Sequence, residues 1–278
     1  MFKKILAATL ALTLSPAVIA DNILVVMSDE DHLPLKGEDV YATGFYLNEL
    51  MGPVKRFIDK GHTLTFATPK GMAPSLDIVS DNVMFFSNEE SLKTHKQLLA
   101  DLMITDKIAS PVVSLNRVKQ IGYEHFDALY VPGGHAPMND LLKSAELGTL
   151  LKHFHEKEKL TALVCHGPIA LLSTLSEADQ FVTSLEKGEQ ISTDSTWTYA
   201  GYNMTAFSNA EEEASKGWLG GGTMKFYPQD GLVAAGGNYR ESANLWEPNV
   251  VVDRELITGQ NPASAWVIAE EIIKHLSK

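Results

Sequence analysis

The single cysteine of the chain, Cys165, stands where a nucleophile could act. The apolar run Leu160–Val164 predicts a short buried strand that ends at this residue, and Gly167-Pro168 then opens an apolar helix. Proline suits the first helical turn, where its missing N–H costs nothing. A sharp strand-to-helix turn holds the turn side chain above the sheet edge, and a helix N-terminus favours a thiolate over a thiol. We therefore expect a reactive thiol with a lowered pKa, the alternative being a lone cysteine packed as a small hydrophobe.

The residues around this turn must be positioned by neighbouring strands. Asp127–Val131 is another apolar strand, and Pro132-Gly133-Gly134-His135 follows at its carboxyl end. Paired glycines let the backbone turn tightly and approach a ligand. The first strand, Asn22–Met27, is apolar throughout, which is typical of strands buried on both faces of a parallel sheet.

Strands alternate with helices along the chain, which favours one α/β domain built around a parallel sheet. The site should then lie outside the carboxyl ends of the strands. Further strands are expected at His62–Thr68, Met204–Phe207, Asn249–Val252 and Leu256–Thr258, and helices at Glu89–Met103, Glu146–Lys157, from Ala210 and at Ala263–Leu276. Residues 44–60 predict a helix interrupted at Gly52-Pro53, with Glu49 on its solvated face, and residues 177–194 predict a polar connection.

Composition narrows the class of protein. The 278 residues carry a formal charge of −12, and no basic cluster offers a nucleic-acid surface. Lys3 and Lys4, the apolar run Ile5–Leu14 and Val18-Ile19-Ala20 together predict a bacterial signal peptide over residues 1–20, cleaved after Ala20. We expect a periplasmic mature chain over residues 21–278, where a single cysteine cannot form an internal disulfide.

Five blocks in order give a resemblance that spans most of the mature chain. They read TGFYLNE (Thr43–Glu49), DALYVPGGHAPMNDL (Asp127–Leu141), LVCHGPIALL (Leu163–Leu172), TAFSNAEEEA (Thr205–Ala214) and LITGQNPASA (Leu256–Ala265). Together they resemble the DJ-1/PfpI superfamily, in particular its Hsp31-like branch of glyoxalase III enzymes, deglycases and chaperones. The resemblance implies a single flavodoxin-like domain, related to class I glutamine amidotransferases, with a parallel sheet sandwiched by helices and a cysteine nucleophile elbow.

The resemblance also implies roles for particular residues. Cys165 matches the nucleophile, His166 its neighbouring histidine, and Glu49 the carboxyl that hydrogen-bonds the cysteine sulfur beneath the elbow. Gly134 and the backbone of His166 match the oxyanion hole. The third acidic residue falls within Ser208–Glu213, where we choose Glu212, the alternative being a role lost at Asn209.

The implied activity is the glutathione-independent conversion of methylglyoxal to lactate by a glyoxalase III-type lyase, through a hemithioacetal on Cys165 and an enediol. Repair of early glycation adducts on proteins would use the same thiol. A holdase chaperone, a stress protein that needs apolar surface rather than a thiol, is the second hypothesis, and a PfpI-type cysteine peptidase is the third. A non-catalytic thiol sensor and a class I glutamine amidotransferase are further readings, but the chain shows no partner synthetase domain for the latter.

The expected partners follow from this activity. They are a small α-oxoaldehyde or a glycated protein, with no nucleic acid, no membrane after signal cleavage, and neither a metal nor an organic cofactor. The sequence leaves open whether the protein forms a homodimer.

Overall fold

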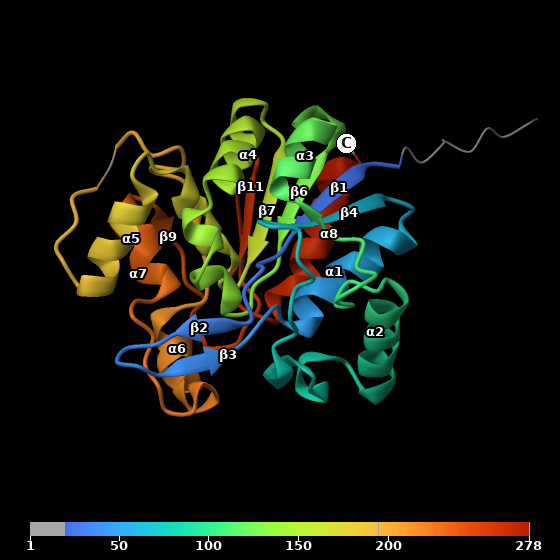
Figure 1. Cartoon of the computed structure of the whole chain (residues 1–278), viewed down its shortest axis with the longest axis horizontal. Helices are drawn as coiled ribbons and strands as arrows, with labels where there is room; N and C mark the ends of the chain where they lie inside the picture. Colours follow the sequence, from blue (N-terminus) through green and yellow to red (C-terminus); the bar gives the residue numbers. More distant parts are fainter. Residues whose placement is uncertain (1–19, 194, 278) are drawn as a thin grey trace, which may run out of the picture.

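A seven-stranded sheet forms the centre of the computed structural model, which describes residues 20–193 and 195–277 (Figure 1). The strand order is β10-β11-β7-β6-β1-β4-β5. The bounds are β1 Asn22–Val26, β4 Thr63–Thr68, β5 Val113–Ser114, β6 Ala128–Val131, β7 Leu160–Val164, β10 Val250–Asp253 and β11 Leu256–Gly259. All neighbours pair in parallel except β10, which runs antiparallel to β11 at one edge. The structure thus confirms the predicted α/β fold.

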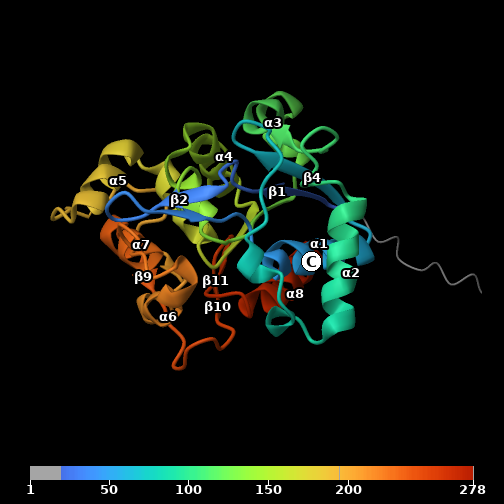
Figure 2. The same cartoon turned by 60° about the horizontal axis from the view of Figure 1, so that its bottom comes forward.

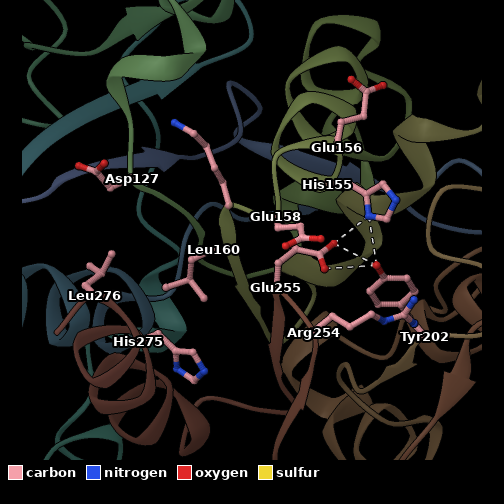
Figure 3. A pocket seen from close by; sticks show the side chains of 11 residues that line it. Asp127, His155, Glu156, Glu158, Leu160, Tyr202, Arg254, Glu255, His275 and Leu276 are labelled. Carbon is pink, nitrogen blue, oxygen red and sulfur yellow. Dashed lines mark hydrogen bonds and ion pairs between the residues drawn. The ribbon is translucent and has the colours of Figure 1, made fainter. Parts of the chain in front are cut away.

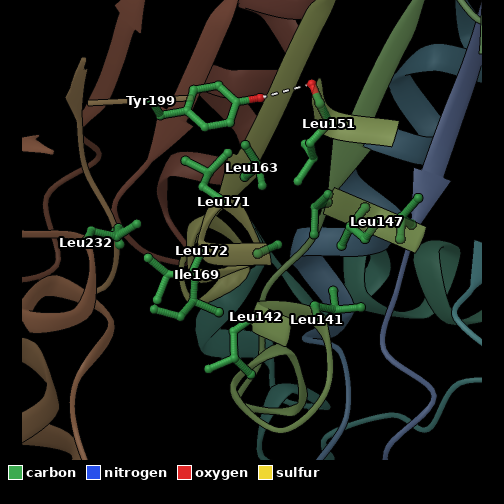
Figure 4. Close-up of a cluster of buried hydrophobic side chains, with 14 of the residues drawn as sticks. Leu141, Leu142, Leu147, Leu151, Leu163, Ile169, Leu171, Leu172, Tyr199 and Leu232 are labelled. Atoms are coloured by element: carbon green, nitrogen blue, oxygen red, sulfur yellow. Dashed lines mark hydrogen bonds between the residues drawn. The ribbon is translucent and has the colours of Figure 1, made fainter. Parts of the chain in front are cut away.

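The central strands are buried on both faces because successive side chains enter two different hydrophobic clusters. Leu24, Leu129 and Leu163 belong to one cluster, in which Ile169 and Leu172 also pack (Figure 4). The alternate residues on the same three strands belong to the other cluster, and these are Ile23, Val25, Ala128, Tyr130, Ala162 and Val164. This alternation explains why β1, β6 and β7 are continuous apolar runs in the sequence.

Eight α-helices are described, and they cover both faces of the sheet (Figures 1 and 2). Their bounds are α1 Leu47–Asp59, α2 Glu89–Asp101, α3 Leu115–Ile121, α4 Ala145–Glu156, α5 Ala178–Lys187, α6 Asn209–Ser215, α7 Pro228–Ala235 and α8 Ser264–Leu276. α1 packs against α2 and α8 on one side, and α3 packs against α4 on the other. Two of the helices begin with side-chain caps, since the side chain of Asn88 accepts the N–H of Ser91 and Ser208 forms a capping box with Glu211.

Short elements complete the described chain. A hairpin joins β2 His32–Pro34 to β3 Val40–Ala42, and β8 Asn203–Met204 pairs with β9 Asn238–Tyr239. The 3₁₀ turns are Ile78–Ser80, Val83–Phe85, Tyr123–His125, Ala136–Met138, Leu141–Lys143, Gly167–Thr174 and Lys216–Leu219.

None of the described helices has the length and hydropathy required to cross a membrane. The signal-peptide prediction falls on residues 1–20, of which 1–19 lie outside the described residues.

The predicted break at Gly52-Pro53 is wrong, because α1 runs through Pro53 as one helix. Proline has no N–H to donate to the carbonyl four residues earlier, which belongs to Glu49. The hydroxyl of Tyr130 on β6 donates to that carbonyl instead. Gly52 is needed for packing, since a Cβ there would lie 2.8 Å from the ring of Trp266 on α8. The hydrogen bond from Tyr130 to the Glu49 carbonyl therefore replaces the helical N–H donor that Pro53 lacks.

The connection predicted over residues 177–194 is also wrong, because α5 lies within it. The apolar residues of this helix recur at helical spacing and pack against the core, so the sequence does carry an amphipathic pattern, which the prediction overlooked among the surrounding polar residues; they are Ala178, Phe181, Val182 and Leu185. Gly188 ends α5 in the left-handed conformation, with φ of 66°.

Candidate active site

Cys165 forms the sharp turn between β7 and the 3₁₀ helix Gly167–Thr174. Its φ is +61°, a left-handed conformation that is uncommon for any residue with a side chain and that is found at functional sites. Two backbone hydrogen bonds fix the turn. The N–H of Cys165 donates to Gly259 at 2.9 Å, and its carbonyl accepts the N–H of Phe207 at 2.9 Å. The elbow is therefore held between the end of β11 and the segment that leads into α6.

Glu49 lies in the first turn of α1 and is fully buried, as the resemblance implies and contrary to the expectation for a solvated helical face. Its Oε2 accepts the backbone N–H of Gly133 at 2.9 Å. Within the described chain, Oε1 is otherwise without a hydrogen-bond partner, and the Cys165 thiol interacts with the Glu49 carboxyl by a hydrogen bond. Burial raises the pKa of Glu49 to about 8, although the neighbouring thiol and the Gly133 N–H both lower it.

The two glycines after β6 allow the backbone to lie very close to neighbouring groups of the site. A Cβ on Gly133 would lie 2.6 Å from the Cβ of Cys165 and 2.6 Å from Oε2 of Glu49. Gly134 has φ of +85°, and a Cβ there would lie 2.0 Å from the carbonyl oxygen of Gly44. The N–H of Gly134 acts on Cys165, because it lowers the pKa of the thiol. Gly134 is also one of the two residues to which the resemblance assigns the oxyanion hole, a role that stays a prediction.

A chain of hydrogen-bonded groups joins the thiol to a buried carboxyl. Sγ of Cys165 lies 3.2 Å from Nδ1 of His166, and Nε2 of the same ring lies 2.9 Å from Oε1 of Glu212. All three side chains are at most 2% exposed. The alternative at Asn209 is not supported, because its side-chain amide donates to Asp230 at 2.7 Å instead. The capping box at the start of α6 fixes the first helical turn, and this turn carries Glu212 inward.

The electrostatics of this site are governed by burial. It lowers the pKa of His166 to about 3, so the imidazole is neutral, and raises the pKa of Glu212 to about 7. Burial also raises the pKa of Cys165 well above its usual value, and the Glu49 carboxyl raises it further. The predicted lowering of the thiol pKa is therefore wrong for the free site. The helix after Cys165 is a 3₁₀ turn and its partial charge does not outweigh the loss of water.

His135 is a buried residue of this site to which the sequence reasoning assigned no role. Its ring lies 4.2 Å from that of His166, centroid to centroid, and its Nε2 is 4.0 Å from Oε2 of Glu212. The only signal in the sequence was its place after Gly133-Gly134. Burial lowers the pKa of His135 to about 3, so this imidazole is also neutral.

A cavity of about 880 Å³ lies at the opposite end of the sheet from these residues. It is bordered by the amino ends of β6, β7 and β11, with Asp127, Leu160 and Glu255 among its lining residues (Figure 3). Inside it, His155 and Tyr202 both contact Glu255, at 2.8 Å and 3.1 Å, and the guanidinium of Arg254 lies 3.2 Å from the Tyr202 ring centroid. The four reactive groups, Cys165, His166, Glu49 and Glu212, do not line this cavity.

Comparison with known proteins finds a matching family and several relatives. Residues 40–215 match the model of a family described as ThiJ/PfpI family-like. A probable glutathione-independent glyoxalase of Schizosaccharomyces pombe is 27% identical over 274 residues, covering 92% of this chain and 98% of that protein. A protein/nucleic acid deglycase of Escherichia coli is 25% identical over 252 residues, covering 88% of this chain and 77% of the relative.

Among solved structures, glyoxalase III of Candida albicans superposes with a TM-score of 0.67 at 19% identity, covering 91% of this chain and 96% of that one. At this identity the likeness concerns the fold alone.

Proposed function

Because the chain belongs to the ThiJ/PfpI-like family, we propose that it is an enzyme that converts α-oxoaldehydes such as methylglyoxal to 2-hydroxy acids without glutathione. One observation carries this proposal, the continuous contact from Sγ of Cys165 through the ring of His166 to Glu212. Such a chain couples a nucleophile to a base that a third group orients. The glyoxalase and deglycase names of the two relatives support the same class of reaction.

The first step follows from the protonation states of the site. The thiol is protonated and the imidazole neutral, so Nδ1 of His166 takes the proton as Sγ attacks the aldehyde carbon. Glu212 accepts from Nε2 and stabilises the imidazolium that forms. The product is a hemithioacetal, whose oxyanion the N–H groups of Gly134 and His166 would stabilise by a few kcal/mol.

The second step moves a proton between adjacent carbons. A carboxyl with a pKa of about 8 gives up and takes back protons near neutral pH, and Oε1 of Glu49 has no other partner among the described side chains and backbone groups. Glu49 would therefore pass the hydrogen of the thiol-bearing carbon, through an enediol, to the former ketone carbon. A thioester of the hydroxy acid results, and water hydrolyses it to release lactate and the free thiol.

The same thiol could act on early glycation adducts of protein side chains, so we propose deglycation as the alternative substrate class. We also propose a periplasmic location, which rests on the signal-like pattern of residues 1–20. A periplasmic enzyme would benefit from a reaction that needs no glutathione. N-terminal sequencing of the exported protein should give Asp21 as the first residue, and retention of Met1 on the active protein would contradict this.

A lactate assay tests the proposed reaction. The chain starting at Asp21 is incubated with methylglyoxal in the absence of glutathione, beside Cys165→Ala. We expect lactate from the wild type and none above background from the variant. If the wild type neither forms lactate from methylglyoxal nor removes the adduct from a glycated peptide, the proposal is refuted.

A further inference from the structure

We infer that His135, His166 and Glu212 also form a binding site for one divalent transition-metal ion of the zinc type, and that the bound ion switches off the thiol relay. This inference rests on the proposed function for its regulatory part. The binding part stands on geometry alone. One ligand atom from each of the three residues lies within 4.8 Å of those of the other two.

Two of the three residues have polar atoms without a partner. His135 is 3% exposed, yet neither Nδ1 nor Nε2 has a hydrogen-bond partner among the described residues. Oε2 of Glu212, a residue with no exposed surface, is likewise unpartnered in the described chain. The two unpartnered atoms face each other, since Nε2 of His135 is 4.0 Å from Oε2 of Glu212. This distance is too long for a hydrogen bond, so both groups remain unsatisfied in a buried place, which is costly.

A metal ion would satisfy both atoms. Zinc binds imidazole nitrogen and carboxylate oxygen at about 2.0–2.2 Å in tetrahedral geometry, which places two ligand atoms roughly 3.4 Å apart. A small ring rotation that brings Nε2 of His135 closer to Oε2 of Glu212 than the present 4.0 Å would therefore let one ion bind both atoms. Nε2 of His166, 2.9 Å from Oε1 of Glu212, supplies the third ligand. Two imidazoles and one carboxylate suit zinc and its neighbours in the first transition row rather than magnesium or calcium, which prefer oxygen ligands.

Metal binding and the relay exclude each other because both need Nε2 of His166. In the relay, Nε2 carries the proton and donates to Glu212, which leaves Nδ1 free to take the proton of the Cys165 thiol. In the metal site, Nε2 gives its lone pair to the ion, and the single proton of the neutral ring moves to Nδ1. Nδ1 then faces Sγ as a donor and cannot act as a base. Bound zinc would therefore stop the attack on the aldehyde.

Binding is tested first, with zinc chloride titrated calorimetrically into chelator-treated protein starting at Asp21. We expect one ion per chain for the wild type and for Cys165→Ala. His135→Gln and Glu212→Gln should each weaken binding by about a hundredfold or more, given that loss of even an outer-shell partner can cost that much. Circular dichroism checks that both variants are folded, and loss in either folded variant supports the site.

His153→Gln is the matched control. Nε2 of His153 on α4 is also buried and unpartnered among the described residues, but no second and third ligand surround it in the part of the chain that the structure describes. This variant should bind zinc as the wild type does. Absence of stoichiometric binding by the wild type, or wild-type affinity in both His135→Gln and Glu212→Gln, would overturn the inference.

The regulatory part is read from lactate formation with and without stoichiometric zinc, as a ratio within each protein. The wild-type ratio should fall at least about tenfold and recover with EDTA, and the ratio for His135→Gln should stay near one. Equal inhibition of both proteins would refute the switch. An inactive wild type that binds zinc with the expected residue dependence would refute the proposed reaction and leave the site standing.

Discussion

The two ends of the central sheet differ in how they hold their charged groups. At the carboxyl ends of β6 and β7, Glu49, Cys165 and His166 are almost wholly removed from water. At the amino ends, a cavity of about 880 Å³ exposes charged side chains such as Glu156, and its His155–Glu255 pair is partly open to solvent. The end with the visible cavity lacks the reactive groups, and the end with the reactive groups is closed.

The reactive side chains of this molecule are therefore found where they are buried, and not where the surface has an open cavity. Removal from water raises the pKa of Glu49 to about 8 and lowers that of His166 to about 3, which makes neutral side chains available for proton transfer. At the amino end, solvent screens the charges. Substitutions at the two ends should therefore have effects of very different size.

The largest effect is expected for Cys165→Ser. A serine hydroxyl is a far poorer nucleophile than a thiol in a site built for sulfur, so lactate formation should fall by about a thousandfold or more. Suppression of the aggregation of a heated client protein, which would need only apolar surface, should be unchanged. Initial rates of lactate formation and light scattering measure the two properties. Lactate formation within tenfold of the wild type would remove the thiol from the mechanism.

Glu212→Gln should come next. The amide keeps the size of the side chain but cannot stabilise an imidazolium on His166, so kcat should fall by roughly a hundredfold or more. Glu213→Gln is the control, because this neighbouring carboxylate is exposed and bonds Lys216 and Tyr227 instead. Steady-state kinetics give kcat for both variants. An equal loss of kcat in Glu213→Gln would show that the substitutions merely disturb α6.

Tyr130→Phe should have an intermediate effect. It removes the hydroxyl that donates to the Glu49 carbonyl, a carbonyl that Pro53 leaves without a helical partner. We expect a loss of about 1–3 kcal/mol in the free energy of unfolding and a modest drop in kcat. Urea denaturation gives the first value. Pro53→Ala in the same background should recover part of the stability, because an alanine N–H can take the place of the hydroxyl, and no recovery would contradict this explanation.

The buried carboxyl should also shape the pH dependence of stability. The pKa of Glu49 is about 8 in the folded protein and near 4.5 when unfolded, so the folded state binds more protons between these values. Its contribution to stability is therefore present below pH 4.5 and is lost as the pH rises through 8. The midpoint temperature of thermal unfolding should fall less between pH 5 and pH 9 for Glu49→Gln than for the wild type. An unchanged slope would mean that Glu49 titrates normally.

The smallest effect is expected at the open end of the sheet. Tyr202→Phe removes the hydroxyl that contacts Glu255 and His155. Because this group lies at the amino ends of the strands, kcat/KM for methylglyoxal should change by less than about twofold, and stability by no more than about 1 kcal/mol. A large loss of activity here would break the contrast between the two ends.

The sequence carried enough information for those features that depend on local patterns. The apolar run before Cys165, the caps at Asn88 and Ser208 and the glycines after β6 each have a short-range cause, and the structure contains the corresponding elements. Features set by tertiary contacts were not accessible. The helix through Pro53 depends on Tyr130, which is 77 positions further along the chain. The missed helix α5 has a different cause, because its apolar residues do follow helical spacing and were outweighed in the prediction by the polar residues around them.

The site shows the same division. The resemblance supplied Cys165, His166, Glu49 and Glu212, and the fold brings all four together. The pKa of the thiol could not be deduced from its place at a helix start, because its sign depends on how completely neighbouring elements exclude water. The relation of His135 to Glu212 also needed coordinates, since β6 and α6 are far apart in the sequence.

Because the elbow is closed, the reactivity of the Cys165 thiol reports on local opening motions of the protein. Cys165 is the only cysteine and is 2% exposed, with its backbone bonded to Gly259 and Phe207. A bulky thiol reagent can therefore react only during transient openings, and its rate at saturating reagent reports how often the elbow opens. Substrate would have to use the same openings, so the opening frequency sets an upper limit on turnover.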